Sequence, residues 1–407
     1  MSISDNIFYY LIFRWRSFII KFEYFTSSGS IFRRQLMNNI FSSDNFKFSF
    51  TTAYALILAG LISAGPSGAA GMDSINIYGY FDLGYNITTG NRYSKSGPNS
   101  PNLKNGAFDQ RHLNILTDIM VSPNVALRTH VEFEHGIHPS ADSASVVMEY
   151  GFGEYTYSDT LKIRGGKMLS PYGIYSEIHD ATPAYLAVSP PETFYRAEFK
   201  GGHMVVPKWS TGLAILGELS LFSSRHDVDY VIYVGNGESR FTTNESEQDD
   251  NPNKSLGARL QFISAGEVLV FGVSGFMGDR ALSLEEMRVP HIAMTSHLSL
   301  TWKGANLTGE FGRSQMGSVT EITWYVQASV RVGRVTPYAR VQVIDPNDTT
   351  PDDFWTVMLG GVNIRVTDAM FVKMEWDENQ RGKRNTDIIS GESRNFGEFR
   401  AAVTLMF

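Results

Sequence analysis

The chain has 407 residues, a formal net charge of −7 and no cysteine, which excludes disulfides, thiolate metal sites and cysteine nucleophiles. Its hydrophobic fraction of 43% excludes an intrinsically disordered chain, and its acidic balance argues against a nucleic-acid-binding protein. The many aromatic residues, with 27 phenylalanines and 19 tyrosines among them, are typical of β-structure.

The first feature along the chain is an apolar run at residues 53–65, AYALILAGLISAG. It falls short of the roughly 18 residues that a membrane-spanning helix requires, but it has the length of a signal-peptide core. Small residues follow it, so residues 37–70 are predicted to be a signal peptide that is cleaved near Ala70; the alternative is a buried core helix. Residues 1–36 are apolar but interrupted by charges. We expect them to be a start-site artefact or a leader that precedes the true start at Met37.

From Ile75 onward, apolar and polar side chains alternate with the period of β-strands. Trp324 and Val326, for example, share one face of a predicted strand, and Tyr325 and Gln327 share the other. Sixteen strands are predicted, to within about two. They are expected near residues 75–86, 108–120, 124–135, 145–157, 161–168, 209–222, 227–236, 254–264, 267–277, 291–302, 305–316, 319–331, 335–345, 353–366, 369–380 and 395–407.

The connections between these strands fall into tight turns and long polar segments, such as 157–160 and 236–253. Short turns at one end and long loops at the other are typical of a bacterial outer-membrane barrel. A bilayer offers no partners to backbone groups, so a sheet within it must close on itself, and sixteen strands enclose a water-filled lumen. Residues 71–407 are therefore predicted to form an all-β, antiparallel transmembrane β-barrel with short periplasmic turns and long extracellular loops. The alternative is a pair of soluble β-sandwiches, whose outward faces would be charged.

The chain ends in a strand pattern, NFGEFRAAVTLMF, that finishes on Phe407. It resembles the terminal signal of Gram-negative outer-membrane barrels, which implies that Phe407 is read by the barrel assembly machinery. Residues 74–407 resemble a Gram-negative porin, because INIYGYFDLGY (75–85) is similar to the first strand of many porins. The segment DYVIYVGNG (229–237) resembles the phosphate-selective porin group, although the basic ladder of that group has no residue-by-residue match here. The resemblance implies a homotrimer surrounded by outer-membrane lipid and lipopolysaccharide.

Among the lumen-facing residues predicted from the alternation, basic side chains outnumber acidic ones, with nine arginines or lysines against four glutamates. A basic wall favours anions, since charged rings select the permeant ion. The alternative is a mixed wall without preference, because salt screens charges beyond about 8 Å in a wide pore. The pore-lining residues singled out are Arg128, Glu132, Arg164, Arg259, Arg331, Arg340, Arg365 and Lys373.

The segment 169–208 is the candidate constriction loop, because about forty residues without a strand pattern are uncommon unless functional or disordered. Its many aromatic residues argue against disorder. Folded inward, it would narrow the lumen; the alternatives are an outward-packed loop and an extra strand pair between 196 and 206. The residues expected to line the constriction are Glu177, His179, Asp180, Glu192 and Arg196.

No metal site, cofactor or enzymatic activity is predicted. His130, His135 and His138 lie near one another in sequence, but alternation turns His135 away from the face of His130. The chain lacks nucleophile, zinc-protease, P-loop and dinucleotide-binding motifs. The sequence therefore favours a water-filled diffusion channel for small hydrophilic solutes or ions. The alternatives are a barrel that binds or adheres through its outer loops and an outer-membrane barrel enzyme.

Overall fold

The computed structural model describes residues 75–92, 102–134, 146–178, 181–195, 205–221, 226–236, 253–281, 288–385 and 391–407. The expected leader at 1–36 and the expected signal peptide at 37–70 lie outside these residues. Among the described residues, no helix is long and apolar enough to cross a membrane.

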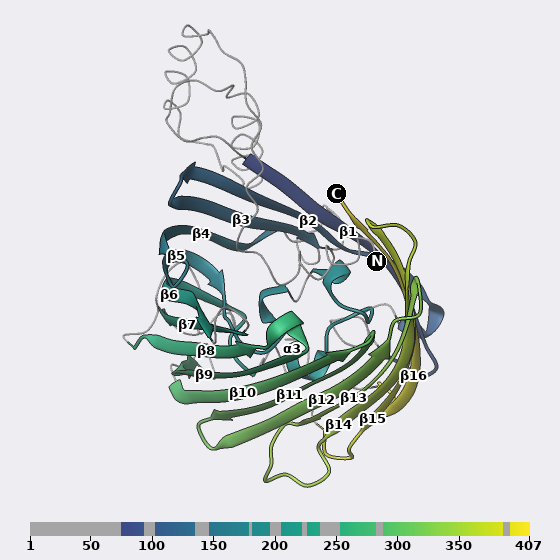
Figure 1. Cartoon of the computed structure of the whole chain (residues 1–407). Coiled ribbons are helices and arrows are strands. Elements are labelled where there is room, and N and C mark those ends of the chain that lie inside the picture. Colours follow the sequence, from purple (N-terminus) through teal and green to yellow (C-terminus); the bar gives the residue numbers. More distant parts are fainter. Residues whose placement is uncertain are drawn as a thin grey trace, which may run out of the picture. The chain divides into compact units, whose positions relative to one another are not determined.

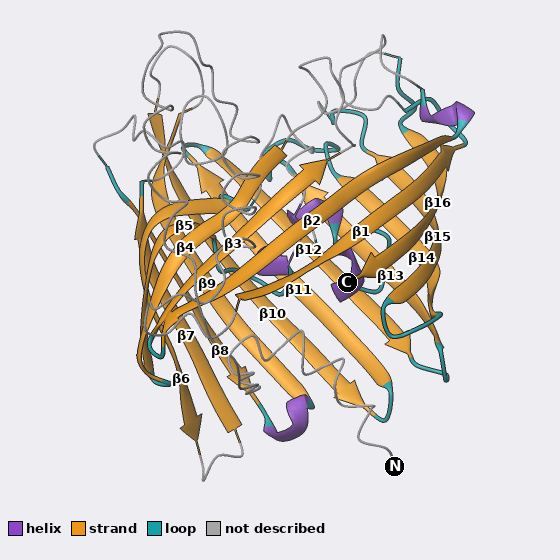
Figure 2. Ribbon diagram, turned by 90° about the horizontal axis from the view of Figure 1, so that it is seen from above, coloured by secondary structure: helices purple, strands orange, loops and turns teal. Residues whose placement is uncertain are grey.

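The described residues form sixteen strands that close into one antiparallel barrel, as predicted, with β1 paired to β16 (Figure 1, Figure 2). The strands are β1 (Ile75–Thr88), β2 (Ala107–Ser122), β3 (Val125–Glu134), β4 (Val146–Ser158), β5 (Leu161–Leu169), β6 (Trp209–Leu221), β7 (His226–Gly235), β8 (Ser255–Ile263), β9 (Leu269–Ala281), β10 (Arg288–Trp302), β11 (Ala305–Met316), β12 (Val319–Val330), β13 (Val335–Asp345), β14 (Trp355–Arg365), β15 (Met370–Arg381) and β16 (Asn395–Met406). Short helical turns are η2 (Leu103–Asn105), η3 (Ser176–Ile178), η4 (Thr182–Ala184), α3 (Glu192–Tyr195) and η5 (Ala265–Glu267).

Side chains divide between the outer and inner faces of the barrel as the alternation predicts. On β12, Trp324 and Val326 are exposed on the outer surface, whereas Tyr325 and Gln327 are buried on the inner face. The same division holds on β15, where Trp376 points outward and Lys373 inward. An outer surface of exposed aliphatic and aromatic side chains belongs in a bilayer, because water would be a poor solvent for it.

The ladder is irregular at some places, and two strands differ from their predicted bounds. Register shifts lie between His130 and Val131 and between Thr156 and Ser158, and each of them interrupts the alternation of faces along β4. β9 ends at Ala281 and β10 begins at Arg288, so the connection between them is shorter than the predicted strands, which end at residue 277 and begin at 291, would leave.

The C-terminal residue completes the seam between the last and first strands. The Phe407 N–H donates to the Gly79 carbonyl (3.0 Å), and the Gly79 N–H donates to the Phe407 carbonyl (2.9 Å). The Phe407 ring is exposed on the outer surface, where an interfacial aromatic side chain is favoured. Its role in recognition by the assembly machinery stays a prediction.

Candidate functional site

Residues 170–178 and 181–195, which follow β5, lie inside the barrel, where η3, η4 and α3 stand within the ring of strands (Figure 1). We call these two described stretches, 170–178 and 181–195, the inward segment. Its aromatic side chains pack into one buried cluster, in which Tyr195 is 1% exposed and Tyr172 stacks on it with ring centroids 5.5 Å apart. Phe194 meets Tyr325 of β12 edge-on. Fully burying such a side chain stabilises by about 1.5–3 kcal/mol, so this cluster holds the segment against the wall.

A buried carboxylate on β11 provides one polar attachment for the inward segment. The Tyr195 hydroxyl donates to Glu310 (2.6 Å to Oε2) and accepts the backbone N–H groups of Ile174 (2.9 Å) and Tyr175 (3.1 Å). The Tyr325 hydroxyl also donates to Glu310. Burial raises the pKa of the Tyr195 hydroxyl well above its ordinary value, so it stays protonated and keeps its role as a donor.

Replacing Tyr195 with phenylalanine is expected to loosen this attachment. The substitution removes one hydrogen-bond partner from each of two backbone N–H groups and from the buried Glu310 carboxylate. We expect this to destabilise the anchored position of the segment by about 1–3 kcal/mol. We expect larger current fluctuations in the open channel, measured by single-channel recording. Tyr157→Phe is the matched control, because Tyr157 is exposed on the outer surface of β4. Equal current fluctuations in the Tyr195→Phe and Tyr157→Phe channels would contradict the conclusion that Tyr195 holds the inward segment against the wall.

A second attachment surrounds Lys373 of β15, which is fully buried. Its ammonium donates to the backbone carbonyls of Thr182, Tyr185 and Ala187, the last at 3.0 Å, and it lies 4.7 Å from the centre of the Tyr185 ring. Three carbonyls converge on one cation, which determines how the chain turns between 182 and 187. Lys373 therefore contacts the inward segment instead of open water.

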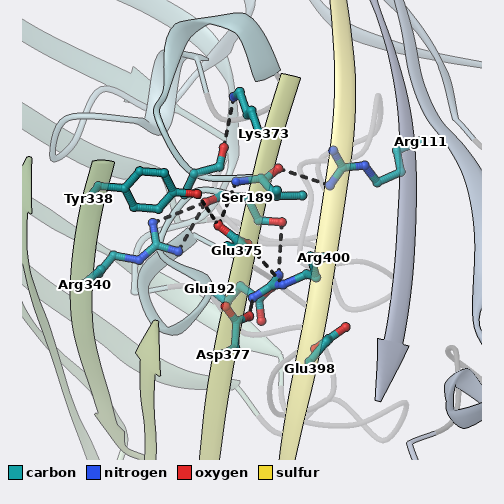
Figure 3. A network of polar contacts seen from close by, with 12 residues as sticks. Arg111, Ser189, Glu192, Tyr338, Arg340, Lys373, Glu375, Asp377, Glu398 and Arg400 are labelled. Carbon is teal, nitrogen blue, oxygen red and sulfur yellow. Dashed lines mark hydrogen bonds and ion pairs between the residues drawn. The ribbon is translucent and has the colours of Figure 1, made fainter. Parts of the chain in front are cut away.

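A third attachment centres on Arg400 of β16 (Figure 3). Its guanidinium pairs with Glu192 of the inward segment and with Asp377 and Glu375 of β15, the last at 3.2 Å. It also donates to the Ser189 hydroxyl (3.3 Å). Arg400 thus joins two neighbouring strands to the segment through one side chain that is 5% exposed.

Two further arginines extend this arrangement around the wall. Arg340 of β13 donates to the Ser189 carbonyl (3.2 Å), and Arg111 of β2 pairs with Asp82 and donates to the Val188 carbonyl (3.1 Å). We call the whole set the anchor network, and its four cations and four carboxylates balance. Its members are Arg111, Arg340, Lys373, Arg400, Asp82, Glu192, Glu375 and Asp377.

The wall across from the anchor network carries arginines that are partly exposed. Arg164 of β5 donates to Glu154 through Nε (3.1 Å) and Nη2 (2.9 Å), and its guanidinium lies 4.2 Å from the centre of the Phe152 ring. Glu177 of the inward segment reaches this wall, with Oε2 2.7 Å from Arg259 of β8 and Oε1 4.0 Å from Arg164. The two hydrogen bonds to Glu154 and the contact with the Phe152 ring restrict the orientation of the Arg164 guanidinium.

Arg128 of β3 completes what we call the arginine wall, Arg128, Arg164 and Arg259. It lies 3.4 Å from Glu154 and 3.8 Å from Asp118. These arginine side chains are 14–16% exposed and Glu177 is 35% exposed, compared with 6% for the Arg400 side chain. Of the two charged regions, the arginine wall is the one that water and dissolved ions reach.

The structure divides the residues predicted from the sequence into separate groups. It brings Arg128, Arg164, Arg259 and Glu177 together at the arginine wall. It places Arg340, Lys373 and Glu192 in the anchor network, covered by the segment and away from the open lumen. Glu132 is fully buried on β3, where it contacts His112 (2.6 Å) and accepts from Asn114 (3.3 Å). The predicted residues that lie outside the described residues are His179, Asp180, Arg196, His135 and His138.

Two predicted pore-lining arginines lie at the ends of strands, and one of them, Arg331, requires a correction. Arg331 follows the end of β12 and lies in the exposed β12–β13 turn. Arg365 is the last residue of β14 and pairs with Asp368 in the next turn (2.6 Å). Arg365 keeps its predicted place at the end of the wall, because it belongs to β14 and lies opposite the buried Phe371 in the β14–β15 ladder. Alternation continues past the end of a strand, so it placed Arg331, a turn residue, on a wall that it does not join.

Several residues of the site were not singled out from the sequence. Arg111 sits at a register shift in the β1–β2 ladder, which breaks the alternation that would have assigned its face. Asp377 and Asp82 do follow the alternation, and their inward positions on β15 and β1 could have been read from it. Among the described residues, no group of three or more histidine, aspartate or glutamate side chains is arranged to hold a metal ion.

No protein-family model matches the chain. An uncharacterized protein of Aquifex aeolicus (strain VF5) is 24% identical over 165 residues, which cover 40% of this chain and 32% of that relative. The chain therefore spans about a third of the length of the relative it matches.

Solved structures that resemble the barrel are outer-membrane proteins. The anion-selective porin from Comamonas acidovorans has a TM-score of 0.57 at 9% identity, covering 82% of this chain and 99% of the porin. The outer membrane channel DcaP of Acinetobacter baumannii has a TM-score of 0.55 at 10% identity, covering 84% of this chain and 99% of DcaP. The trimer form of OmpT, an outer membrane protein of Vibrio cholerae, has a TM-score of 0.52 at 13% identity, covering 83% of this chain and 100% of OmpT. The chain thus has the porin-like fold of bacterial outer-membrane barrels.

Proposed function

We propose that this barrel is a porin, a water-filled diffusion channel for small hydrophilic solutes or ions across the bacterial outer membrane. The observation that carries the proposal is the inward segment, which is attached to the wall by the anchor network and presents Glu177 to the arginine wall. A sixteen-strand barrel is too wide for its own wall side chains to fill, so a segment that occupies part of the lumen sets the size of the passage. The passage then runs past Arg128, Arg164 and Arg259.

The charges along that passage support a weak preference for anions over cations. The arginine wall and Lys162 contribute four positive charges, and the neighbouring carboxylates Asp118, Glu154 and Glu177 contribute three negative ones. Phosphate selectivity is not part of the proposal, because β7, which holds most of the segment resembling phosphate-selective porins, has no lysine or arginine among its residues. A small positive excess fits weak selectivity in a salt-screened pore.

Neutralising the arginine wall is expected to move ion selectivity toward cations. The variant carries Arg128→Gln, Arg164→Gln and Arg259→Gln, which leaves Lys162 facing three carboxylates. We expect the reversal potential, measured across a planar bilayer with a salt gradient, to shift in the direction of cation preference. Arg331→Gln is the matched control because Arg331 lies in an exposed turn. A triple variant with the reversal potential of the wild type would contradict the proposed position of the passage.

We further propose that the barrel does not catalyse a reaction. Ser296 and His297 are neighbours on β10 and point to opposite faces, and the His297 Nε2 lies 3.1 Å from Gln261 Oε1. A serine nucleophile requires a histidine on its own face within hydrogen-bond reach. The Ser314 hydroxyl does lie 2.8 Å from His291 Nε2, but both side chains are fully buried, where a substrate would not reach them. The same planar-bilayer recording separates the alternatives, since a porin gives large, persistent current steps and a barrel that only binds or adheres gives little current.

By likeness to the trimer form of OmpT, we also propose a homotrimer.

A further inference from the structure

The short turns at the periplasmic end of the barrel differ in charge from one side to the other. The turn after β10 carries Lys303 and the turn after β12 carries Arg331 and Arg334, whereas Arg365 ends β14 and the turn after it carries Asp368. By contrast, the turn after β4 carries Asp159, and η5 after β8 contains Glu267. The β2–β3 turn holds no charged residue, and the β6–β7 turn lies outside the described residues. Among the described turns, positive charge therefore gathers on one stretch of the periplasmic edge.

The basic turns form one continuous surface because they are hydrogen-bonded to one another. The Arg331 N–H donates to the Gly304 carbonyl (2.8 Å), which joins the β10–β11 and β12–β13 turns. The Arg365 N–H donates to the Arg334 carbonyl (2.9 Å), which joins the β12–β13 and β14–β15 turns. Lys303 and Gly304 both have positive φ, of 49° and 84°, as the tight hairpin turn requires. We call Lys303, Arg331 and Arg334 the basic rim.

Among the described residues, no carboxylate pairs with these three side chains. Lys303 Nζ lies 4.6 Å from the centre of the Trp302 ring, Arg331 Nε donates to the Gly333 carbonyl (3.4 Å), and Arg334 Nη1 donates to the Val366 carbonyl (3.1 Å). Arg365 differs from them, because it pairs with Asp368. The basic rim therefore retains three positive charges and guanidinium donors for an external anion.

Exposed apolar side chains flank the basic rim. Trp302 is 68% exposed and Val332 is 65% exposed, and Val335 and Val366 are exposed beside them. An exposed tryptophan next to exposed aliphatic side chains is expected at the boundary between acyl chains and headgroups. The three charges consequently lie at the depth of the phospholipid headgroups of the inner leaflet.

We propose that the basic rim binds the phosphate groups of anionic phospholipids in the inner leaflet of the outer membrane. Arginine forks match phosphate oxygens in geometry, and clustered basic residues beside a membrane recruit anionic lipid. An acidic peptide is the other source of negative charge, but it would have to lie across a surface whose exposed tryptophan and valines belong in lipid. The apolar flank therefore favours the lipid.

The test uses Trp302 as a reporter of the lipid beside the basic rim. Refolded mature protein is placed in phosphatidylcholine vesicles in which a minority of the lipid is dibrominated phosphatidylglycerol, or dibrominated phosphatidylcholine for comparison. The difference in fluorescence quenching between wild type and Trp302→Phe gives the quenching of Trp302 itself. Enrichment of anionic lipid at the basic rim predicts about twofold more quenching by the brominated phosphatidylglycerol.

A triple variant, Lys303→Gln with Arg331→Gln and Arg334→Gln, is expected to abolish the excess quenching while single-channel conductance stays at the wild-type value. The control variant, Asp159→Asn with Glu267→Gln, changes charge elsewhere on the same edge and is expected to keep the excess. Raising the salt concentration should reduce the excess, because exposed charges are screened. Equal quenching by the two brominated lipids, or an excess that survives the triple variant, would overturn the proposal.

Discussion

Replacing residues 182–192 with a short glycine–serine linker should raise the single-channel conductance by roughly twofold or more, because a sixteen-strand barrel without an inner segment is an open channel. The replaced residues include the carbonyls around Lys373 and the Ser189 and Glu192 contacts of Arg400. The strand ladder does not depend on them, since each strand is paired on both sides around the closed barrel. Glu177 is retained, so its contacts with the arginine wall are kept.

The control for this truncation is a deletion of similar kind in the exposed β13–β14 connection, at residues 347–350, which lies outside the strands. Both variants should keep the heat-resistant, fast-migrating form of a folded barrel on a denaturing gel. Only the truncation of the inward segment should change conductance, measured in planar bilayers. A folded truncation variant that conducts like the wild type would show that residues 182–192 do not limit the passage.

The strands could be predicted closely because alternation is a local property of the chain. β11 and β13 have the predicted bounds, since each runs without interruption between two turns. The alternation is interrupted where an extra residue enters the ladder, as near Thr156. Alternation reports which face a side chain occupies as long as each residue takes one place in the ladder.

The charge of the passage could not be predicted in the same way, because alternation gives the face of a residue and not what covers it. Arg340 and Lys373 face inward as predicted, and so does Arg400, yet the inward segment covers all three and carboxylates balance their charge. Arg331 and Arg365 lie at the periplasmic end. The predicted basic excess therefore rests on fewer arginines than the sequence suggested. Contacts between a loop and a wall more than a hundred residues away leave no periodic signal in the sequence.

Replacing Arg400 with methionine should release the inward segment from the wall. The change leaves the anchor network with three cations, Arg111, Arg340 and Lys373, against its four carboxylates. Removing one partner of a buried ion pair costs roughly 3–5 kcal/mol, because the other partner stays buried without compensation. Glu192 loses the guanidinium that ties α3 to β16, so the anchored position of the segment becomes the less stable one.

We expect conductance to rise toward that of the truncated variant, with strong current fluctuations as the segment leaves and rejoins the wall. Limited proteolysis should cut within residues 182–192 faster than in the wild type, because a released backbone is accessible to protease. Arg400→Lys keeps the charge and loses the fork, so its effect should be intermediate. A methionine variant with wild-type conductance, noise and protease resistance would contradict the holding role of Arg400.

The paired change Arg400→Met with Asp377→Asn tests whether charge balance is the cause. Asp377 pairs with Arg400, and removing both charges leaves three cations and three carboxylates in the anchor network. Replacing a whole buried pair is often close to neutral, whereas breaking it is not. The double variant should therefore recover much of the anchored behaviour, with less noise and slower proteolysis than Arg400→Met alone. The difference measures the coupling between the two side chains. If the double variant is as noisy as the single one, the segment is held by the geometry of the Arg400 contacts to Glu192 and Glu375, and charge balance contributes little.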